Sequence, residues 1–226
     1  MAARRYAALL LDMDGTLIDS MPIHQQAWGR WHAELGLPFD DAGFFQATAG
    51  RANDEVLSGL FPAMPAAERA ALAERKEALY REAAAGALQY VAGAQAFLQQ
   101  ARAAGFKLAV CTASPAANLR IVFERFGLDR LVDTVASPAD GLRGKPHPDI
   151  FVEAARRLGV AAADCLVFED APLGVEAARR AGMDAVALAT TLPPSAFDGH
   201  PNLLATIPDF VGVDPTTFIP REPHHA

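Results

Sequence analysis

"LLLDMDGTLIDS", residues 9–20, places two acids at the end of a strongly apolar run. The run covers residues 6–13, and a short, continuous apolar segment is typical of a strand buried on both faces of a sheet. Asp12 and Asp14 lie at the end of this strand. Side chains two residues apart in a strand point to the same side, so both carboxylates are predicted to face one site.

The later part of the chain repeats a helix-then-strand order. Each helical pattern ends in a glycine, a residue that tolerates the left-handed conformation just past a helix, and a short apolar segment follows. Helices that alternate with buried strands predict an α/β fold, a Rossmann-like parallel sheet with helices on both faces. The expected helices cover residues 93–105, 148–159 and 171–182, and the expected strands cover residues 106–114, 164–170 and 184–190.

The segment between the first strand and residue 90 has a different pattern, with helical periodicity and no convincing strand. It predicts an all-helical cap, residues 20–89, inserted into a catalytic core made of residues 1–19 and 90–226. Asn53 is the expected N-cap of one of its helices. The helical patterns cover residues 23–36, 53–61 and 66–86.

Composition narrows the classes of function. The chain has 226 residues, 51% of them hydrophobic, and a formal net charge of −7. This size fits one large domain or a domain that carries an insert. The negative charge argues against nucleic acid or an anionic membrane as a partner. No apolar run approaches membrane-spanning length, and the basic, then apolar start runs into acids without a cleavage site, so no signal peptide is expected.

The two cysteines, Cys111 and Cys165, both lie inside apolar segments. They are predicted to be buried thiols in a reducing compartment, which favours the cytoplasm. A monomer or weak homo-oligomer is expected. The final "PREPHHA", residues 220–226, is expected to be a loose end whose two histidines are too few for a metal site.

Polar residues gather where the predicted strands end, the edge at which open parallel sheets bind ligands. Taken singly, each has an ordinary explanation, such as an aspartate that caps a helix or a lysine on the surface. Together, several carboxylates at one edge require a cation, and oxygen ligands suit Mg²⁺, which also binds phosphate oxygens. A lysine and hydroxyl donors can hold the same phosphate. The candidates are Asp12, Asp14, Thr112, Ser114, Lys145, Glu169 and Asp170.

Four motifs in order resemble those of the haloacid dehalogenase superfamily of phosphotransferases, and they span almost the whole chain. The helical insertion between the first and second motifs is similar to that of the subfamily with a helical cap at this place. That subfamily includes β-phosphoglucomutases, sugar-phosphate phosphatases and phosphoglycolate phosphatases. The motifs are DMDGTLIDS, VCTAS with Thr112, GKPHPDIF with Lys145, and VFEDAPLGVEAARRAGM with Glu169 and Asp170.

The resemblance implies a role for each core residue. Asp12 would attack phosphorus and become an aspartyl phosphate, while Asp14 would protonate the leaving oxygen and later deprotonate water. Lys145 would bridge Asp12 and the phosphate. Mg²⁺ would be held by Asp12, the backbone carbonyl of Asp14, and Asp170, with Glu169 nearby. The dehalogenases of the superfamily lack the second aspartate and the metal, so phosphoryl chemistry is expected.

The cap contributes a second group of candidates. His24 and Trp28 lie four residues apart and share a helical face, although Trp28 could equally pack in the cap core. Lys76 lies on a charged helix and, by pattern alone, is expected to be solvated. β-Phosphoglucomutases carry a similar His-x-x-x-Trp, an arginine in a cap loop and a lysine in an "RK…Y" helix. The resemblance therefore implies substrate-binding residues at His24, Trp28, Gly50, Arg51 and Lys76, with Ser114 from the core.

The predicted function is an Mg²⁺-dependent phosphatase acting on a small phosphorylated metabolite, with a sugar phosphate favoured. Pro115 follows Ser114 where the mutases have lysine, and it offers neither a phosphate-binding side chain nor an N–H. The proline therefore argues against the second phosphate site that a β-phosphoglucomutase needs. A β-phosphoglucomutase is nevertheless the main alternative function, ahead of a pyrophosphatase. A phospho-acceptor signalling domain is the non-enzymatic alternative. Such domains lack a helical insert after the first strand and need no acid two residues beyond the acceptor.

Overall fold

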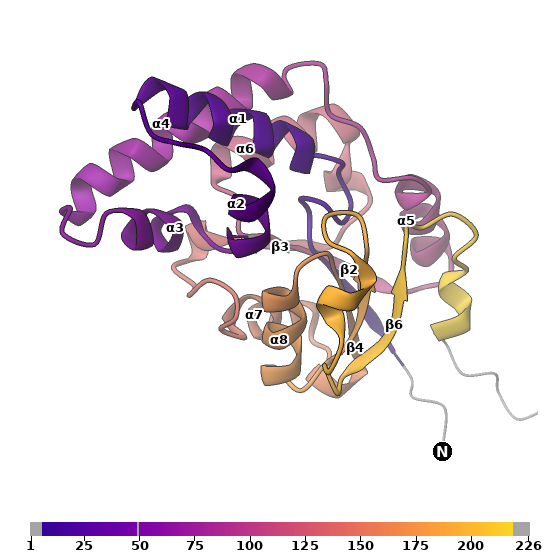
Figure 1. The fold of residues 1–226 in the computed structure, drawn as a ribbon. Helices are drawn as coiled ribbons and strands as arrows, with labels where there is room; N and C mark the ends of the chain where they lie inside the picture. The colour runs from indigo at the N-terminus through magenta and orange to yellow at the C-terminus, as the bar shows by residue number, and fades with distance from the viewer. Residues whose placement is uncertain (1–5, 49, 219–226) are drawn as a thin grey trace, which may run out of the picture.

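The computed structural model describes residues 6–48 and 50–218, and its centre is a six-stranded sheet in the order β3-β2-β1-β4-β5-β6 (Figure 1). Every neighbouring pair of strands is parallel. The predicted α/β class is therefore confirmed. The strands are β1 Ala8–Leu11, β2 Lys107–Cys111, β3 Thr134–Ala136, β4 Cys165–Glu169, β5 Asp184–Leu188 and β6 Leu203–Ile207.

The first strand is apolar throughout because both of its faces are covered. Leu9 and Leu11 belong to one hydrophobic cluster with Phe97 of helix α5, while Leu10 belongs to another with Phe151 of helix α7. Parallel sheets of this kind bury both faces under helices. The helices of this part of the fold are α5 Ala94–Ala103, α6 Ala116–Phe126, α7 Asp149–Leu158 and α8 Pro172–Arg180.

Helix α6 and the two edge strands, β3 and β6, were not among the elements predicted from the sequence. Strand β3 has only three residues, and β6 has no fully buried residue. An edge strand has one neighbour and less apolar surface to bury, so its sequence carries a weaker signal. Five short 3₁₀ helices complete the described chain: Leu128–Arg130, Pro138–Asp140, Ala162–Asp164, Pro194–Phe197 and Pro215–Phe218.

Four of the five helices between β1 and β2 form a layer over one end of the sheet (Figure 1). Within the described part of residues 22–89 there is no strand, so the predicted all-helical insertion is confirmed. The fully buried Trp31 joins two of the helices by donating its indole N–H to the carbonyl of Leu72 at 3.0 Å. The helices are α1 Met21–Glu34, α2 Asp41–Thr48, α3 Asn53–Leu60 and α4 Ala66–Ala84.

The two chain segments that lead into and out of this insertion lie side by side. The amide of Asp19 donates to the carbonyl of Gln89, and the amide of Val91 donates to the carbonyl of Leu17, each at 2.9 Å. Ile18 and Tyr90 form an antiparallel bridge between them. The insertion is therefore connected to the core through one pair of adjacent chain segments.

The prediction that Asn53 caps a helix is wrong. Helix α3 begins at Asn53 itself, and Ala52 occupies the N-cap without a side-chain hydrogen bond. The Asn53 amide donates instead to Oε1 of Glu77 at 2.6 Å. A contact with a residue of another helix has replaced the local capping interaction that this residue type favours.

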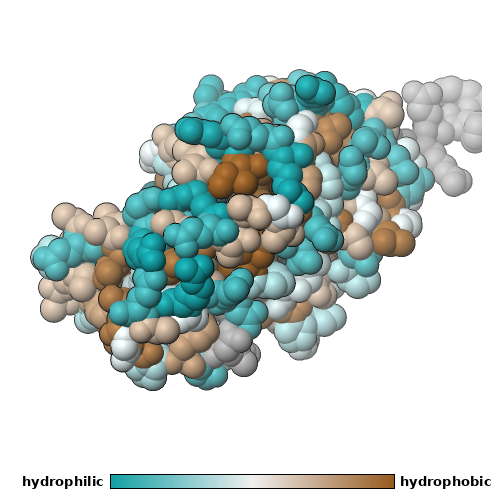
Figure 2. Space-filling model, turned by 90° about the horizontal axis from the view of Figure 1, so that it is seen from above, coloured by the Kyte–Doolittle hydropathy of each residue, from teal (hydrophilic) through white to brown (hydrophobic). Residues whose placement is uncertain are grey.

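The described part of the chain agrees with a further expectation. Cys111 and Cys165 are both buried free thiols, and burial raises the pKa of the Cys165 thiol to about 11. None of the described helices is long and apolar enough to cross a membrane. Seen from the side of the insertion, hydrophilic side chains cover much of the face, with smaller hydrophobic areas between them (Figure 2). The expected loose end, residues 220–226, lies outside the described residues.

Candidate active site

One pocket lies between the carboxyl ends of the strands and the helical insertion, and every predicted site residue lines it. The core contributes Asp12, Asp14, Thr112, Ser114, Lys145, Glu169 and Asp170, and the insertion contributes His24, Trp28, Gly50, Arg51 and Lys76. The sequence thus located the residues of one site, whose chemical roles remain predictions.

Lys145 holds two carboxylates at the base of the pocket. Its ammonium donates to Oδ1 of Asp12 and to Oε1 of Glu169, and at 3.2 Å to the carbonyl of Cys111. Burial lowers the pKa of Lys145, but the charges of Asp12 and Glu169 raise it above its usual value. The ammonium therefore stays charged and fixes the side chain of Asp12 toward the pocket.

The carboxylates outnumber the positive charges at this end of the pocket. Burial raises the pKa of Asp12 well above its usual value, Lys145 opposes the rise, and Glu169 and Asp170 add to it. Burial and the charge of Glu169 raise the pKa of Asp170 to about 8, although Thr191 donates a hydrogen bond to its Oδ2. The ionised forms of Asp12 and Asp170 are thus destabilised. A cation bound between the two carboxylates would stabilise their ionised forms.

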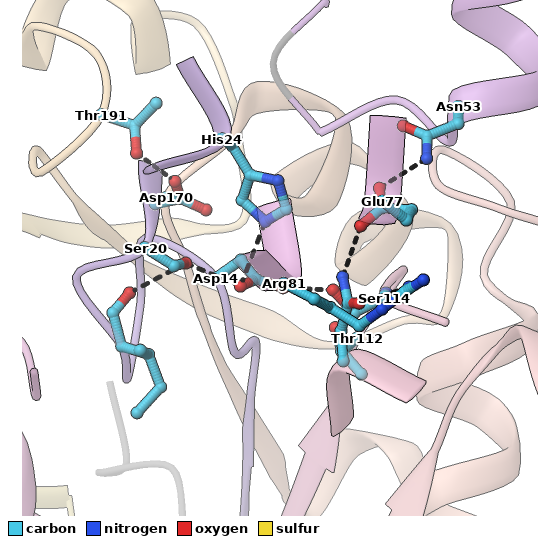
Figure 3. Close-up of polar contacts among 12 residues, drawn as sticks. Asp14, Ser20, His24, Asn53, Glu77, Arg81, Thr112, Ser114, Asp170 and Thr191 are labelled. Carbon is cyan, nitrogen blue, oxygen red and sulfur yellow. Dashed lines mark hydrogen bonds and ion pairs between the residues drawn. The ribbon is translucent and has the colours of Figure 1, made fainter. Parts of the chain in front are cut away.

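Asp14 has the opposite environment. Ser20 donates to its Oδ1 at 2.6 Å, Ser114 donates to its Oδ2 at 2.5 Å, and Nε2 of His24 lies 3.5 Å from Oδ1 (Figure 3). Burial opposes ionisation, but the contacts with His24, Ser114 and Ser20 lower the pKa of Asp14 to about 2. Two acids two residues apart therefore differ in pKa because their partners differ.

Ser20 is a functional candidate that the sequence analysis missed. It occupies the N-cap position of helix α1 but makes no side-chain cap hydrogen bond there. Its hydroxyl donates a hydrogen bond to Asp14 instead. The residue type was visible in the sequence, but serine before a helix predicts a cap, and only the fold brings it against Asp14.

Thr112 and Ser114 lie just beyond the end of β2. The amide of Thr112 donates to the carbonyl of Ala136 at 3.1 Å, and the amide of Ser114 donates to Oγ1 of Thr112 at 3.0 Å. These bonds hold the turn in which the Ser114 hydroxyl reaches Asp14. The turn thus links the second strand to the pair of acids on the first.

Lys76 is buried, so the expectation of a solvated lysine is wrong. Its ammonium lies 2.8 Å from Nδ1 of His24 and 5.2 Å from the centre of the Trp28 ring. A lysine ammonium offers only donors, so Nδ1 of His24 accepts and the proton lies on Nε2, toward Asp14. The imidazole is also stacked on Tyr80, with ring centres 3.9 Å apart.

Trp28 satisfies both interpretations offered by the sequence. It is buried and packs against Trp31 and Phe44, as a residue of the insertion's core does. It also lines the pocket and lies beneath the ammonium of Lys76. The same side chain therefore supports the insertion and forms part of the pocket wall.

Comparison with known proteins identifies the family of this chain. Residues 6–182 match the model of the haloacid dehalogenase-like hydrolases. The chain belongs to this family. The family expectation drawn from the four motifs is therefore confirmed.

The relatives of this haloacid dehalogenase-like hydrolase include phosphatases with named substrates. Validoxylamine A 7'-phosphate phosphatase of Streptomyces hygroscopicus subsp. limoneus is 32% identical over 82% of this chain and 87% of its own. Fructose-1-phosphate phosphatase YqaB of Escherichia coli is 32% identical over 80% of this chain and 96% of its own. A family IA hydrolase structure from Entamoeba histolytica has the same fold, with a TM-score of 0.84, 24% identity, and coverage of 93% of this chain and 98% of its own.

The donor set of this haloacid dehalogenase-like hydrolase fits Mg²⁺. Among the described residues, no three acid, histidine or cysteine side chains surround one point closely enough to hold a metal ion as they stand. Mg²⁺ needs only one or two carboxylates, because water and phosphate oxygens complete its coordination. Asp12 and Asp170 are the best candidates. Glu169 has both oxygens engaged, by Lys145 and by the amide of Ala171 at 2.9 Å.

Gly50 and Arg51 lie in the loop between α2 and α3. Gly50 has a φ of +78°, and a Cβ added there would lie 2.8 Å from Cβ of Ala171. The glycine therefore allows the insertion to approach the loop that follows Asp170. Arg51 lines the pocket with an exposed side chain, which has no hydrogen bond or ion pair within the described part of the chain.

Gly50→Ala is expected to lower kcat/KM for a sugar phosphate ~10-fold, because the added methyl keeps the insertion from reaching Ala171. The positive φ should also cost about 1–3 kcal/mol of folding free energy, read as a lower melting temperature. Gly36→Ala is the control, since its φ is +65° but nothing lies within 4 Å of the added Cβ. The control should lose similar stability and keep its activity. Equal losses of activity in the two variants would refute the contact role of Gly50.

Proposed function

We propose that this protein is an Mg²⁺-dependent phosphatase that hydrolyses a small phosphorylated sugar or polyol through an aspartyl-phosphate intermediate. The observation that carries the proposal is the paired environment of Asp12 and Asp14. One carboxylate is bound to the buried Lys145 and the other is oriented by Ser20, Ser114 and His24, in the same pocket. Two acids held for different tasks are what a two-step phosphoryl transfer requires.

In the first step, an oxygen of Asp12 forms a bond to phosphorus while the bond from phosphorus to the ester oxygen breaks. The leaving oxygen takes its proton from Asp14. In the second step, Asp14 removes a proton from water, whose oxygen attacks phosphorus and releases Asp12 and inorganic phosphate. Lys145 offsets negative charge at the reacting group, and bound Mg²⁺ would add further positive charge there.

The low pKa of Asp14, about 2, sets it in the base form that the second step needs. The first step requires the protonated form. A phosphate dianion bound beside Asp14 raises its pKa by like-charge repulsion, so a proton is taken up together with the substrate. The hydrogen bonds from His24 and the two serines stabilise Asp14 when it is ionised, and they no longer favour it in the same way once it is protonated.

The choice of a sugar or polyol rests on the insertion side of the pocket. Arg51, Lys76 and Asn53 bring N–H donors to the wall opposite the reacting acids. Hydroxyl groups of a carbohydrate accept such hydrogen bonds. The names of the two relatives, a fructose-1-phosphate phosphatase and a validoxylamine A 7'-phosphate phosphatase, support the same class of substrate.

We further propose that residues 20–89 act as a cap on a core of residues 1–19 and 90–226. The paired segments around Ile18 and Tyr90 would serve as its hinge. The free buried cysteines support a reducing compartment such as the cytoplasm. The small phosphorylated metabolite is the partner that the proposed reaction requires.

Hydrolysis is favoured over mutase activity because of the turn after Ser114. Pro115 lines the pocket and occupies the N-cap of α6, where it offers no N–H to a second phosphate. The two residues that follow are alanines. A signalling domain is disfavoured by family membership and by the acid at position 14.

The proposal is tested with a panel of phosphorylated metabolites that includes fructose 1-phosphate, sugar-alcohol phosphates, pyrophosphate and β-glucose 1-phosphate. Phosphate release should occur with Mg²⁺, stop with EDTA and return when excess Mg²⁺ is added. Glucose 6-phosphate is measured in parallel by a coupled assay. Its formation from β-glucose 1-phosphate without phosphate release would identify a mutase, and a single turnover on every ester would identify a phospho-acceptor.

Arg51→Ala is expected to lower kcat/KM for the best sugar phosphate far more than for p-nitrophenyl phosphate, by ~10-fold or more. Binding energy from the remote part of a substrate supports orientation at the reacting atoms, and the nitrophenyl group offers no hydroxyls to Arg51. Steady-state kinetics on both substrates check this result. An equal loss on both substrates would assign Arg51 to the chemistry or the fold. No loss on any substrate would show that Arg51 is a solvated loop residue without a role in substrate binding.

A further inference from the structure

A buried contact joins the insertion to the core beside the pocket. Asn118, on α6 of the core, is fully buried. Its Nδ2 donates to Oε2 of Glu77 at 2.5 Å, and its Oδ1 accepts a hydrogen bond from Arg81 at 3.3 Å. Glu77 and Arg81 both lie on α4 of the insertion. Both ends of one amide are therefore occupied by the facing helix.

Glu77 is held from three directions. Its other oxygen, Oε1, accepts from Asn53 at 2.6 Å and from Lys76 at 2.8 Å, and the residue is 4% exposed (Figure 3 draws Glu77 with Asn53). A buried carboxylate with this many donors has a single favourable position. Any displacement of α4 from α6 would take both partners from the buried Asn118 amide and would take from Oε2 of Glu77 its donor on α6.

The contacts continue from Glu77 to the reacting acid. Lys76 donates to Glu77 and also lies against Nδ1 of His24, while Nε2 of His24 lies 3.5 Å from Asp14. An unbroken series of polar contacts thus runs from the core through the insertion and back to the core. Each member is fixed by its neighbours on both sides.

We propose that Glu77 and Asn118 are positioning residues that clasp the insertion onto the core and thereby hold His24 against Asp14. The inference rests on the proposed phosphatase function and adds two residues to it. Glu77 lines the pocket, and the hydrogen bonds of both residues go to Asn53, Lys76, Arg81 and each other, and not to the reacting acids. Their effect on the reaction passes through Lys76 and His24 to the carboxyl that donates the proton.

This role predicts a particular dependence on the leaving group. Phenyl and p-nitrophenyl phosphate are similar in size, and neither carries hydroxyls for the insertion to bind. Phenol is a much weaker acid than p-nitrophenol, so its departure needs the proton from Asp14 far more. Disturbing the contact between Glu77 and Asn118 should therefore slow the hydrolysis of phenyl phosphate much more than that of p-nitrophenyl phosphate.

Exchanging the acid and the amide provides the test. In Asn118→Asp a carboxylate faces the carboxylate of Glu77. In Glu77→Gln two amide N–H₂ groups face each other, and turning the Asn118 amide would oppose its N–H₂ to Arg81. In the double variant, the amide introduced at position 77 keeps its oxygen toward Asn53 and Lys76. Its N–H₂ group then donates to the carboxylate introduced at position 118, so the contact is restored with its direction reversed.

Each single variant is expected to lower kcat on phenyl phosphate by ~10-fold or more, and on p-nitrophenyl phosphate by less than ~3-fold. The complete contribution of a general acid is worth roughly 10²–10⁴-fold, and the variants should lose part of it. The double variant should recover at least half of the lost activity. Glu34→Gln is the matched control, because it breaks an exposed ion pair with Arg75 that does not reach the core. It should behave as the wild type on both esters.

Three outcomes overturn the proposal in a folded protein: equal losses on the two aryl esters, no loss in either single variant, or a double variant no better than the singles. Circular dichroism and thermal melting establish folding. Should Asn118→Asp fail to fold, Asn118→Ser replaces it, since a shorter hydroxyl cannot reach Glu77 and brings no opposing charge. A wild type that turns over no phosphate ester would refute the proposed function instead.

Discussion

Asp12→Asn is expected to reduce turnover of every phosphate ester at least ~10³-fold, a loss of about 4 kcal/mol of transition-state stabilisation. The amide has nearly the same shape, but it is a poor nucleophile and a poorer ligand for Mg²⁺. The protein should remain folded. Lys145 keeps Glu169 as a partner, and one negative charge leaves a site where carboxylates already raise one another's pKa values.

The measurement is steady-state phosphate release, with thermal melting recorded in the absence of Mg²⁺. The melting temperature of the variant should equal or exceed that of the wild type, because the buried charge at position 12 is unfavourable without a cation. Asp129→Asn, at an exposed position, serves as the control and should change neither property. A variant that keeps more than about a tenth of wild-type turnover, a loss under ~1.4 kcal/mol, would show that Asp12 is not the nucleophile.

Asp14→Asn is expected to slow both the formation and the breakdown of the phosphoenzyme, each by roughly 10²–10⁴-fold. The amide fits the space between Ser20, Ser114 and His24 but can neither donate the proton to the leaving oxygen nor accept one from water. The first step should be less affected for p-nitrophenyl phosphate, because its leaving group departs without much help. The second step involves the same phosphoenzyme for every substrate and should be slowed equally.

Rapid-quench detection of the phosphoenzyme separates the two steps. With a sugar phosphate, little phosphoenzyme should form in the variant. With p-nitrophenyl phosphate, it should form quickly and persist. If both half-reactions keep their wild-type rates, Asp14 has no part in proton transfer and the environment described around it serves the fold.

The local pattern of the chain was sufficient for the central strands and for the helices that alternate with them. Strand β1 is read directly because both of its faces are buried, so its apolar run has no polar interruption. Helices α5, α7 and α8 each end close to a glycine with positive φ, at Gly105, Gly159 and Gly182. The edge strands β3 and β6 escaped prediction because they have fewer buried neighbours to impose a pattern.

Site residues that follow strand ends were equally accessible from the sequence. Parallel strands bring their carboxyl ends to one edge, so Asp12, Thr112 and Asp170 meet by topology alone. The substrate-binding residues of the insertion required the family resemblance as well. Pattern alone made Lys76 a solvated side chain, whereas the packing of α4 against α1 buries it beside His24.

The sequence by itself determined the alternating fold, the helical insertion and the pair of acids at the end of β1, because each follows from periodicity or from spacing along a strand. Only the tertiary structure decided the partners of those acids. Lys145 lies 133 positions from Asp12, and Asn118 lies 41 from Glu77. Asn53 was expected to cap a helix, and Ser20 occupies an N-cap position, yet each bonds a carboxylate outside its own helix. In both cases the side chain donates to a largely buried carboxylate and makes no N-cap hydrogen bond. Leaving a buried charge without a donor costs more free energy than leaving a helix without a side-chain cap.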